Sequence, residues 1–209
     1  MKAHNAETQA SMTPQKALQF LKKGNLRFQQ NLKANRNLLE QVNDTKDGQF
    51  PFATVLSCID SRVSAELVFD QGLGDIFSIR IAGNFINQDI LGSMEFACKL
   101  AGTRLLLVLG HTSCGAVKGA CDHARLGHLT TLINKIEPAV AAVKEPREES
   151  ERTSKNLQFV DAVAEENVRM ALENIRSQSK ILCEMERDGE IGIVGAMYDI
   201  STGEVRFLK

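Results

Sequence analysis

Two apolar runs, residues 52–56 and 104–109, constrain the fold of this chain most strongly, because residues that bind metals follow each of them. Both runs have the length and the continuous apolar character of strands buried on both faces of a sheet. The first run leads to Cys58, and the second leads to His111 and Cys114. Ligands of an open parallel α/β sheet bind at the carboxyl edge of the strands, so we expect these three side chains to meet there.

Thiolates and imidazole are ligands that zinc prefers, and three protein ligands with one open position are typical of a catalytic zinc site. His111 and Cys114, with two residues between them, have a common local ligand spacing. Gly110 and Gly115 flank this pair and are expected to allow tight turns around the ligands. The sequence therefore predicts one Zn²⁺ per chain, with the fourth position taken by water or by Asp60.

Strand-like and helix-like segments alternate along the chain, which predicts a single α/β domain over residues 1–209 with a mainly parallel central β-sheet flanked by helices. The expected strands are 52–58, 75–81, 104–109, 191–197 and a last one that ends near residue 208. The expected helices are 64–70, 88–100, one from 115 onward, 129–143, and 157–187 as one helix or two. The charged segment 144–156 is expected to be a disordered or variable loop.

A helical arm is expected at residues 14–36, ahead of the α/β core at 52–209. Thr13 and Pro14 form a helix start, with Thr as N-cap and Pro at the first helical position. Gly24 is expected to interrupt the arm and give two short helices or one kinked helix. Such an amphipathic arm covers either its own sheet or a second subunit.

Composition excludes several classes of function. The formal net charge is -1 and no run of basic residues is interleaved with aromatic ones, which argues against nucleic acid or an anionic membrane as partner. No apolar stretch approaches the length of a membrane span, and the start of the chain lacks the apolar core of a secretory signal. We therefore expect a cytoplasmic protein with a small-molecule partner.

The chain has five cysteines, an odd number at irregular spacing, which is typical of metal or catalytic use rather than of a disulfide framework. Cys98 and Cys183 lie in helix-like apolar contexts and are expected in the core. Cys121 fits either use.

Asp60 and Arg62 follow Cys58 at intervals of two residues. In an extended segment this alternation would turn all three side chains to one side. The ordinary explanation for such an Asp and Arg is a solvated ion pair. An acid, a base and a metal ligand on one face indicate a catalytic arrangement instead.

Three motifs together resemble the pattern of the beta-class carbonic anhydrases. They are Cys58-x-Asp60-x-Arg62, Arg80-x-Ala82-Gly83-Asn84 and Gly110-His111-x-x-Cys114-Gly115. The resemblance runs in register from about residue 49 to 115, and it is weaker at 18–28 and in the last strand. It implies zinc held by Cys58, His111 and Cys114, and reversible hydration of carbon dioxide to bicarbonate and a proton by attack of zinc-bound hydroxide.

The resemblance also implies roles for other residues. In this family the residue at Asp60 either bonds the residue at Arg62 and orients the hydroxide, or swings onto zinc and closes the site. The implied substrate-binding positions, some of which the family takes from a neighbouring subunit, are Gln49, Phe77, Ala82, Phe96 and the Gly115 amide. The chain is accordingly expected to form a homodimer or a dimer of dimers.

Some positions depart from the family pattern. Phe96 stands where many members have Tyr, and Ala82 is smaller than the Val of plant forms, so both are expected to reshape the pocket. One subgroup binds bicarbonate at a separate inhibitory site through Trp, Arg and Tyr. This chain has Arg80 and Tyr198 at those places but Val55 in place of the Trp.

Two alternatives remain open from the sequence. One is a hydrolase of a carbon dioxide analogue such as carbonyl sulfide, which related folds with the same zinc ligands perform. The other is a non-catalytic binding module in which Asp60 closes a structural zinc site as fourth ligand. Arg62 argues against the second alternative, because a structural site has no need for a cation that draws one ligand away.

Overall fold

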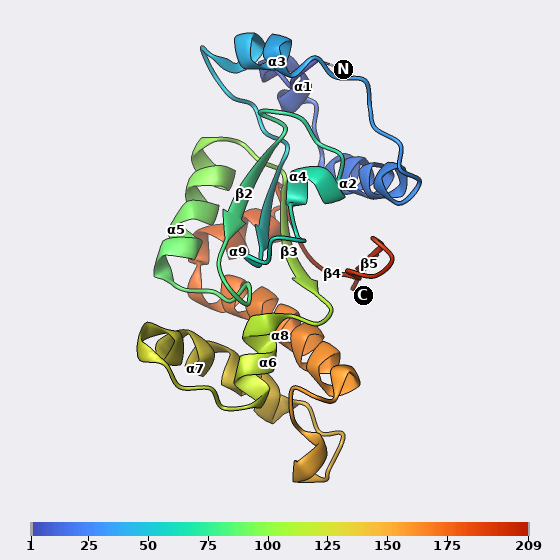
Figure 1. Cartoon of the computed structure of the whole chain (residues 1–209). Coiled ribbons are helices and arrows are strands. Elements are labelled where there is room, and N and C mark those ends of the chain that lie inside the picture. Colours follow the sequence, from blue (N-terminus) through green and yellow to red (C-terminus); the bar gives the residue numbers. More distant parts are fainter. Residues whose placement is uncertain (1, 209) are drawn as a thin grey trace.

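A five-stranded sheet forms the centre of the computed structural model, which describes residues 2–208 (Figure 1). Its strand order is β2-β1-β3-β4-β5; β1 to β4 are parallel, and β5 is antiparallel to β4. The strands are β1 (Ala53–Ser57), β2 (Ile76–Arg80), β3 (Leu105–His111), β4 (Gly192–Tyr198) and β5 (Val205–Phe207). The prediction of a mainly parallel α/β sheet is confirmed.

Helices cover both faces of this sheet. The helices α2 and α4 pack on one face, and α5, α6, α7, α8 and α9 lie on the other (Figure 1). The helical segments are α1 (Ala6–Ala10), α2 (Pro14–Gln29), α3 (Leu38–Thr45), α4 (Ala65–Val68), α5 (Gln88–Glu95), the π-helical turn η1 (Phe96–Leu100), α6 (Gly115–Cys121), α7 (Gly127–Ala142), the 3₁₀ turn η2 (Glu149–Glu151), α8 (Leu157–Gln178) and α9 (Lys180–Arg187).

The core consists of two apolar clusters, one on each face of the sheet. Successive side chains of β3 alternate between them: Leu106 and Val108 join the cluster under α5–α9, and Leu105, Leu107 and Leu109 join the cluster under α2 and α4. Every residue of β3 is buried. A strand that faces apolar side chains on both sides has no polar alternation, which explains the continuous apolar run in the sequence.

The N-terminal arm differs from the prediction in its extent and in the role of one glycine. The helix α2 starts as expected, with the Thr13 side chain accepting the N–H of Lys16, but it ends at Gln29 rather than near residue 36. The helix continues through Gly24 without a break. A glycine stands there because the backbone that follows α4 lies directly against the helix at this point. A Cβ built on Gly24 would be 1.7 Å from the carbonyl oxygen of Phe69. The helix covers its own sheet, and α1 and α3 were not anticipated.

The segment 157–187 forms two helices that meet at Ser179. The Ser179 N–H donates to Ile175 O at the end of α8, and its side chain accepts the N–H of Leu182 at the start of α9. One residue therefore ends one helix and caps the next. The prediction that Cys183 is a core residue is wrong, since it is exposed, whereas Cys98 and Cys121 are buried.

The segment 144–156, which the sequence predicts to be a disordered or variable loop, has a defined course in the structure, where hydrogen bonds hold it to the helices beside it. The Arg152 guanidinium donates to the carbonyl oxygens of Val140, Val143 and Pro146. One partly buried guanidinium thus satisfies carbonyls at the end of α7 and in the loop that follows.

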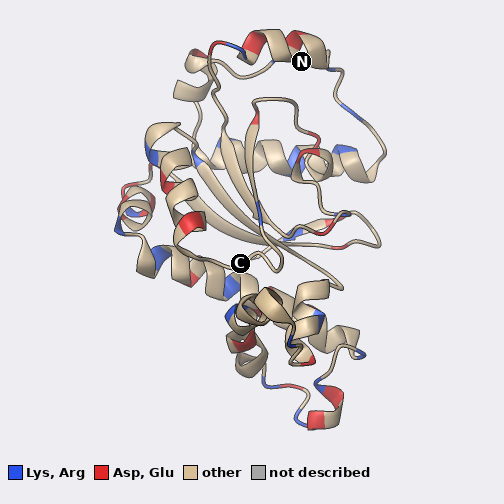
Figure 2. Ribbon diagram, turned by 60° about the vertical axis from the view of Figure 1, so that its left-hand side comes forward, with Lys and Arg blue, Asp and Glu red and all other residues tan. Residues whose placement is uncertain are grey.

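Charged residues of both signs are interspersed over the helices and loops (Figure 2). Several of them form ion pairs between elements, such as Arg176 of α8 with Glu186 of α9 and Arg206 of β5 with Glu165 of α8. Among residues 2–208, no helix combines the length and the apolar character needed to cross a membrane.

Replacing Gly24 with Ala tests the close approach of α2 to the chain after α4. The new methyl group would overlap a backbone carbonyl, so α2 must shift, and we expect a loss of about 3 kcal/mol in the free energy of unfolding. Gly92→Ala in α5 is the control, because its Cβ would meet nothing within 4 Å and Ala favours a helix by up to about 1 kcal/mol. Denaturant unfolding measures both, and equal stability of the two variants would contradict the packing account.

Candidate metal centre

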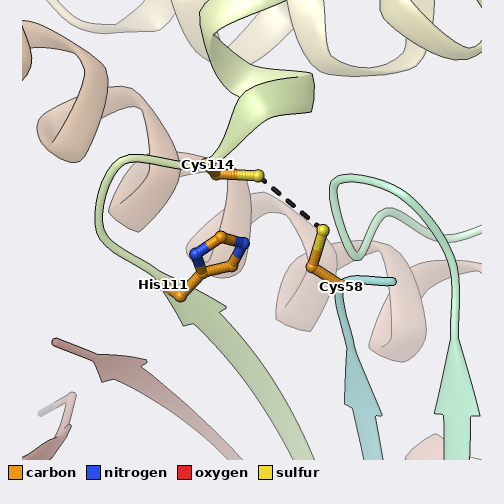
Figure 3. Close-up of side chains that lie close together, drawn as sticks. All are labelled: Cys58, His111 and Cys114. Atoms are coloured by element: carbon orange, nitrogen blue, oxygen red, sulfur yellow. Dashed lines mark hydrogen bonds between the residues drawn. The ribbon is translucent and has the colours of Figure 1, made fainter. Parts of the chain in front are cut away.

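Three buried side chains meet at the carboxyl edge of the sheet (Figure 3). Cys58 follows β1, His111 is the last residue of β3, and Cys114 is the N-cap of α6. Their ligand atoms all lie within 4.8 Å of one another, and the two sulfur atoms are 3.9 Å apart. Within residues 2–208 no other group of His, Cys, Asp and Glu side chains has this arrangement.

The hydrogen bonds of His111 leave one ring nitrogen directed at the sulfur atoms. Its Nδ1 lies 2.9 Å from the carbonyl oxygen of Thr112, so this bond assigns the proton to Nδ1. Its Nε2 is buried and has no hydrogen-bond partner among the described residues. A buried lone pair without a partner is costly, and a metal ion would satisfy it.

The two cysteine sulfurs lie within hydrogen-bonding distance, and this pairing moves their pKa values apart. The pKa of the Cys58 thiol is lowered, first by the hydrogen bond with Cys114 and also by the hydrogen bond that the Gly83 N–H donates to its sulfur. The pKa of Cys114 is raised by the same pairing and by burial. Thiolates and imidazole are ligands that zinc prefers, so this donor set of two sulfurs and one imidazole nitrogen fits zinc.

The turn between His111 and Cys114 depends on Ser113, which has a positive φ of 54°. Its N–H donates to the carboxylate of Asp161 on α8 at 2.7 Å. Thr112 is fixed as well, since its N–H donates to Tyr198 O at 3.0 Å. A side chain far along the sequence thus secures the loop that carries two of the three ligands.

The expectation that Gly110 and Gly115 permit tight turns is wrong. Neither has a positive φ. A Cβ on Gly110 would lie 2.6 Å from Val168 and 2.7 Å from the Met197 sulfur, so this glycine is needed for close packing. A Cβ on Gly115 would meet nothing within 4 Å.

Asp60 and Arg62 form a bidentate ion pair beside the cluster. Arg62 Nε donates to Asp60 Oδ1 at 2.9 Å, and Arg62 Nη2 donates to Oδ2 at 2.7 Å. The expectation of an extended segment is wrong, because Val63 N–H donates to Asp60 O and closes a turn. The hydrogen bonds from Arg62 hold the pKa of the Asp60 carboxyl well below its usual range. Asp60 is not a member of the ligand cluster.

Arg80 at the end of β2 supports the backbone of this segment. Its Nε donates to the carbonyl oxygen of Cys58 at 3.1 Å, and its Nη2 donates to that of Asp60 at 2.7 Å. Arg80, Tyr198 and Val55 are the positions that correspond to the separate bicarbonate site of one subgroup of the family. Tyr198 is buried, which raises the pKa of its hydroxyl, and Val55 is fully buried within the sheet. The contacts of Arg80 serve the ligand loop.

The implied substrate-binding residues do not gather in one hollow of the single chain. Phe77 and Phe96 face each other with ring centroids 6.3 Å apart, over a hollow between β2 and α5. Gln49 lines a separate hollow beside α3. Ala82 is partly buried, directly before Gly83, and Gly115 is exposed at the start of α6. The 52% exposure of Phe96 leaves an aromatic ring uncovered by its own chain.

Two supporting residues, Asp161 and Asn167, were missed in the sequence. Asp161 holds Ser113, and Asn167 donates to the carbonyl oxygen of Gly83 at 2.8 Å. Both lie on α8. Asp161 is 48 positions from Ser113 along the chain, and Asn167 is 84 positions from Gly83. No local spacing marks them, because an Asp and an Asn on an amphipathic helix are read as part of its solvated face.

The family model described as carbonic anhydrase matches residues 53–205 of this chain. The chain is 33% identical over 199 residues to the carbonic anhydrase of Mycolicibacterium smegmatis, with 92% of each chain covered. It is 34% identical over 161 residues to carbonic anhydrase 2 of Mycobacterium tuberculosis, with 75% of this chain and 73% of the relative covered.

Solved structures agree with this match. The beta-carbonic anhydrase CcaA has a TM-score of 0.72 and 26% identity, and the comparison covers 92% of this chain and 95% of that one. The beta-carbonic anhydrase CafA of Aspergillus fumigatus has a TM-score of 0.70 and 26% identity, with 82% and 81% covered. The family model, the relatives and the fold point to one conclusion: the chain is a member of the beta class of the carbonic anhydrase family of enzymes.

Proposed function

We propose that this chain catalyses the reversible hydration of carbon dioxide to bicarbonate and a proton, with one Zn²⁺ held by Cys58, His111 and Cys114. The observation that carries the proposal is the buried group of two sulfurs and an unpartnered imidazole nitrogen, next to an ionised carboxylate. Zinc, when bound, supplies the Lewis acidity that makes water a nucleophile near neutral pH. The cytoplasm remains the proposed location.

Asp60 is the hydrogen-bond acceptor that orients the nucleophile. Its Oδ1 accepts both the backbone N–H and the Nε–H of Arg62, whereas its Oδ2 accepts only one N–H. Oδ2 therefore keeps a free lone pair that can accept a hydroxyl hydrogen. Arg62 keeps this carboxylate ionised and fixes its plane by the bidentate contact.

The same ion pair favours a site with an open coordination position over a closed one. Both carboxylate oxygens of Asp60 are engaged by Arg62, and neither joins the three ligands. A closed structural zinc site would need Asp60 to leave Arg62, and the carboxylate would lose its charge-assisted bidentate contact when it did so. This supports an enzyme rather than a binding module.

The substrate pocket is proposed to lie between two copies of the chain. Phe77 and Phe96 flank one hollow and Gln49 lines another, so a second copy is needed to bring such residues together. Exposed apolar side chains beside the arm support an interface, namely Leu38, Leu39 and Val42 of α3 together with Leu67 and Leu73. We propose a homodimer or a dimer of dimers, in which Ala82 and the Gly115 amide complete the substrate contacts.

Zinc content and hydration activity of one purified sample test the function. We expect about one zinc per chain and rapid hydration of carbon dioxide, with both lost in Cys58→Ala, His111→Ala and Cys114→Ala. Cys98→Ala is the control: Cys98 is equally buried, and burial raises its pKa to about 11, so it should keep the metal. Full zinc occupancy in Cys58→Ala would refute the ligand assignment, and faster turnover of carbonyl sulfide than of carbon dioxide would refute the substrate.

Replacing Asp60 or Arg62 tests the proposed orientation of the nucleophile. We expect Asp60→Ala to lower turnover on the order of 10²-fold or more, since it removes the acceptor, while zinc stays bound. Arg62→Ala should also have very low activity with zinc retained. Asp188→Ala removes the acceptor of an exposed ion pair with Arg187 and should keep full activity. Near-parental turnover of Asp60→Ala or Arg62→Ala would contradict the proposed role and show that the two residues form only a structural ion pair.

Sedimentation of the full chain tests the interface. We expect a dimer or tetramer, and we expect Leu39→Asp with Val42→Asp to shift it toward monomers of low activity, because two charges would be buried in an apolar contact. Ile181→Asp on α9, another exposed apolar residue but one away from α3, is the control and should leave a dimer intact. A fully active monomer at micromolar concentration would contradict the shared pocket.

A further inference from the structure

A buried asparagine stands out on the face of α8 that packs on the sheet. Asn167 is only 4% exposed, and the buried residues around it on this helix include Val163, Val168 and Ala171. Burying a carboxamide costs free energy unless it is hydrogen-bonded. The Nδ2 of Asn167 donates to the carbonyl oxygen of Gly83 at 2.8 Å.

Gly83 connects this bond to the metal centre. Its N–H donates to the sulfur of Cys58 at 3.4 Å, and its carbonyl accepts from Asn167. The conformation between these bonds is unusual, with a φ of +77°. A Cβ at this position would lie 2.4 Å from Ile136 Cδ1, so α7 limits the loop from the other side. The hydrogen bond from Asn167 and the packing of Ile136 therefore set the orientation of the Gly83 N–H that reaches Cys58.

We propose that Asn167 is a positioning residue of the metal centre, acting on Cys58 through the backbone of Gly83. Hydrogen bonds to a ligand atom orient it toward the ion, and loss of such a support costs about 10–100-fold in metal affinity. The inference rests on the proposed role of Cys58 as a zinc ligand. Asn167 itself is not a ligand, and it lies on α8, far from Cys58 along the sequence.

The surroundings of Asn167 determine which substitution is informative. Asn167 forms part of the wall of a hollow of about 550 Å³ between the start of α5, α7 and α8. A small residue at this position would let water enter and donate to Gly83 O in place of the amide. Leucine has the same number and branching of side-chain heavy atoms as asparagine but bulkier ends and no donor, so Asn167→Leu leaves the carbonyl unpaired and excludes water.

Zinc affinity of the full-length chain, measured by competition with a chelator, tests the proposal. We expect Asn167→Leu to raise the Kd for zinc about 10–100-fold, and Asn167→Ala to raise it less. Asn174→Leu is the matched control, because Asn174 lies on the same helix and lines the same hollow, and its side chain accepts a hydrogen bond from Gln178, one turn further along α8. It should keep the parental Kd.

A second readout separates positioning from general stability. Cobalt(II) bound in place of zinc gives a thiolate-to-metal charge-transfer band, and we expect this band to shift in Asn167→Leu and not in Asn174→Leu. A role confined to stability would lower the free energy of unfolding of the metal-free chain while the Kd and the band stay parental, and this result would overturn the proposal. Should Asn167→Leu not fold, an unchanged Kd and band in Asn167→Ala would overturn it equally. If the parental chain bound neither metal, the proposed function itself would fall.

Discussion

The parallel pairing of β1 with β3 is the constraint on which the metal centre depends. Ser57 pairs with Leu109 at the last rung, so Cys58 leaves the sheet beside Gly110 and close to His111. A slip of one residue in a parallel ladder would send each side chain to the opposite face. Apolar side chains on both faces of these strands prevent such a slip, since either face would lose its packing. The register that buries the core also sets the spacing of the ligands.

The parts of the fold that follow from local pattern could be predicted from sequence, and the parts that follow from close approach could not. Continuous apolar runs gave the central strands, and the strand ends gave Cys58, His111 and Cys114. The roles predicted for Gly24 and Gly110 were wrong, because a glycine can be required either for its backbone freedom or for its small size, and the sequence does not distinguish the two. Gly24 and Gly110 are both explained by what a Cβ would strike.

The supports of the site were beyond local reasoning for a different reason. Asp161 accepts from the backbone of the loop between His111 and Cys114, and Asn167 donates to the backbone of Gly83, whose N–H reaches Cys58; both partners are distant in the sequence. Their residue types are common on solvated surfaces, and only the fold shows which of them turns inward. The bidentate contact of Asp60 with Arg62 was within reach of the sequence, whereas the turn that makes it was not, because alternation applies only to extended backbone.

The hydrogen bond from His111 to Thr112 O has a consequence for how a metal ion could enter the site. It ties Nδ1 to a backbone carbonyl of the same loop, so Nε2 is the ring nitrogen left for a ligand bond. The imidazole ring cannot turn over without losing this bond. Metal uptake therefore needs no rotation of the ring, because the nitrogen that would bind the ion already lies within 4.8 Å of both sulfur atoms.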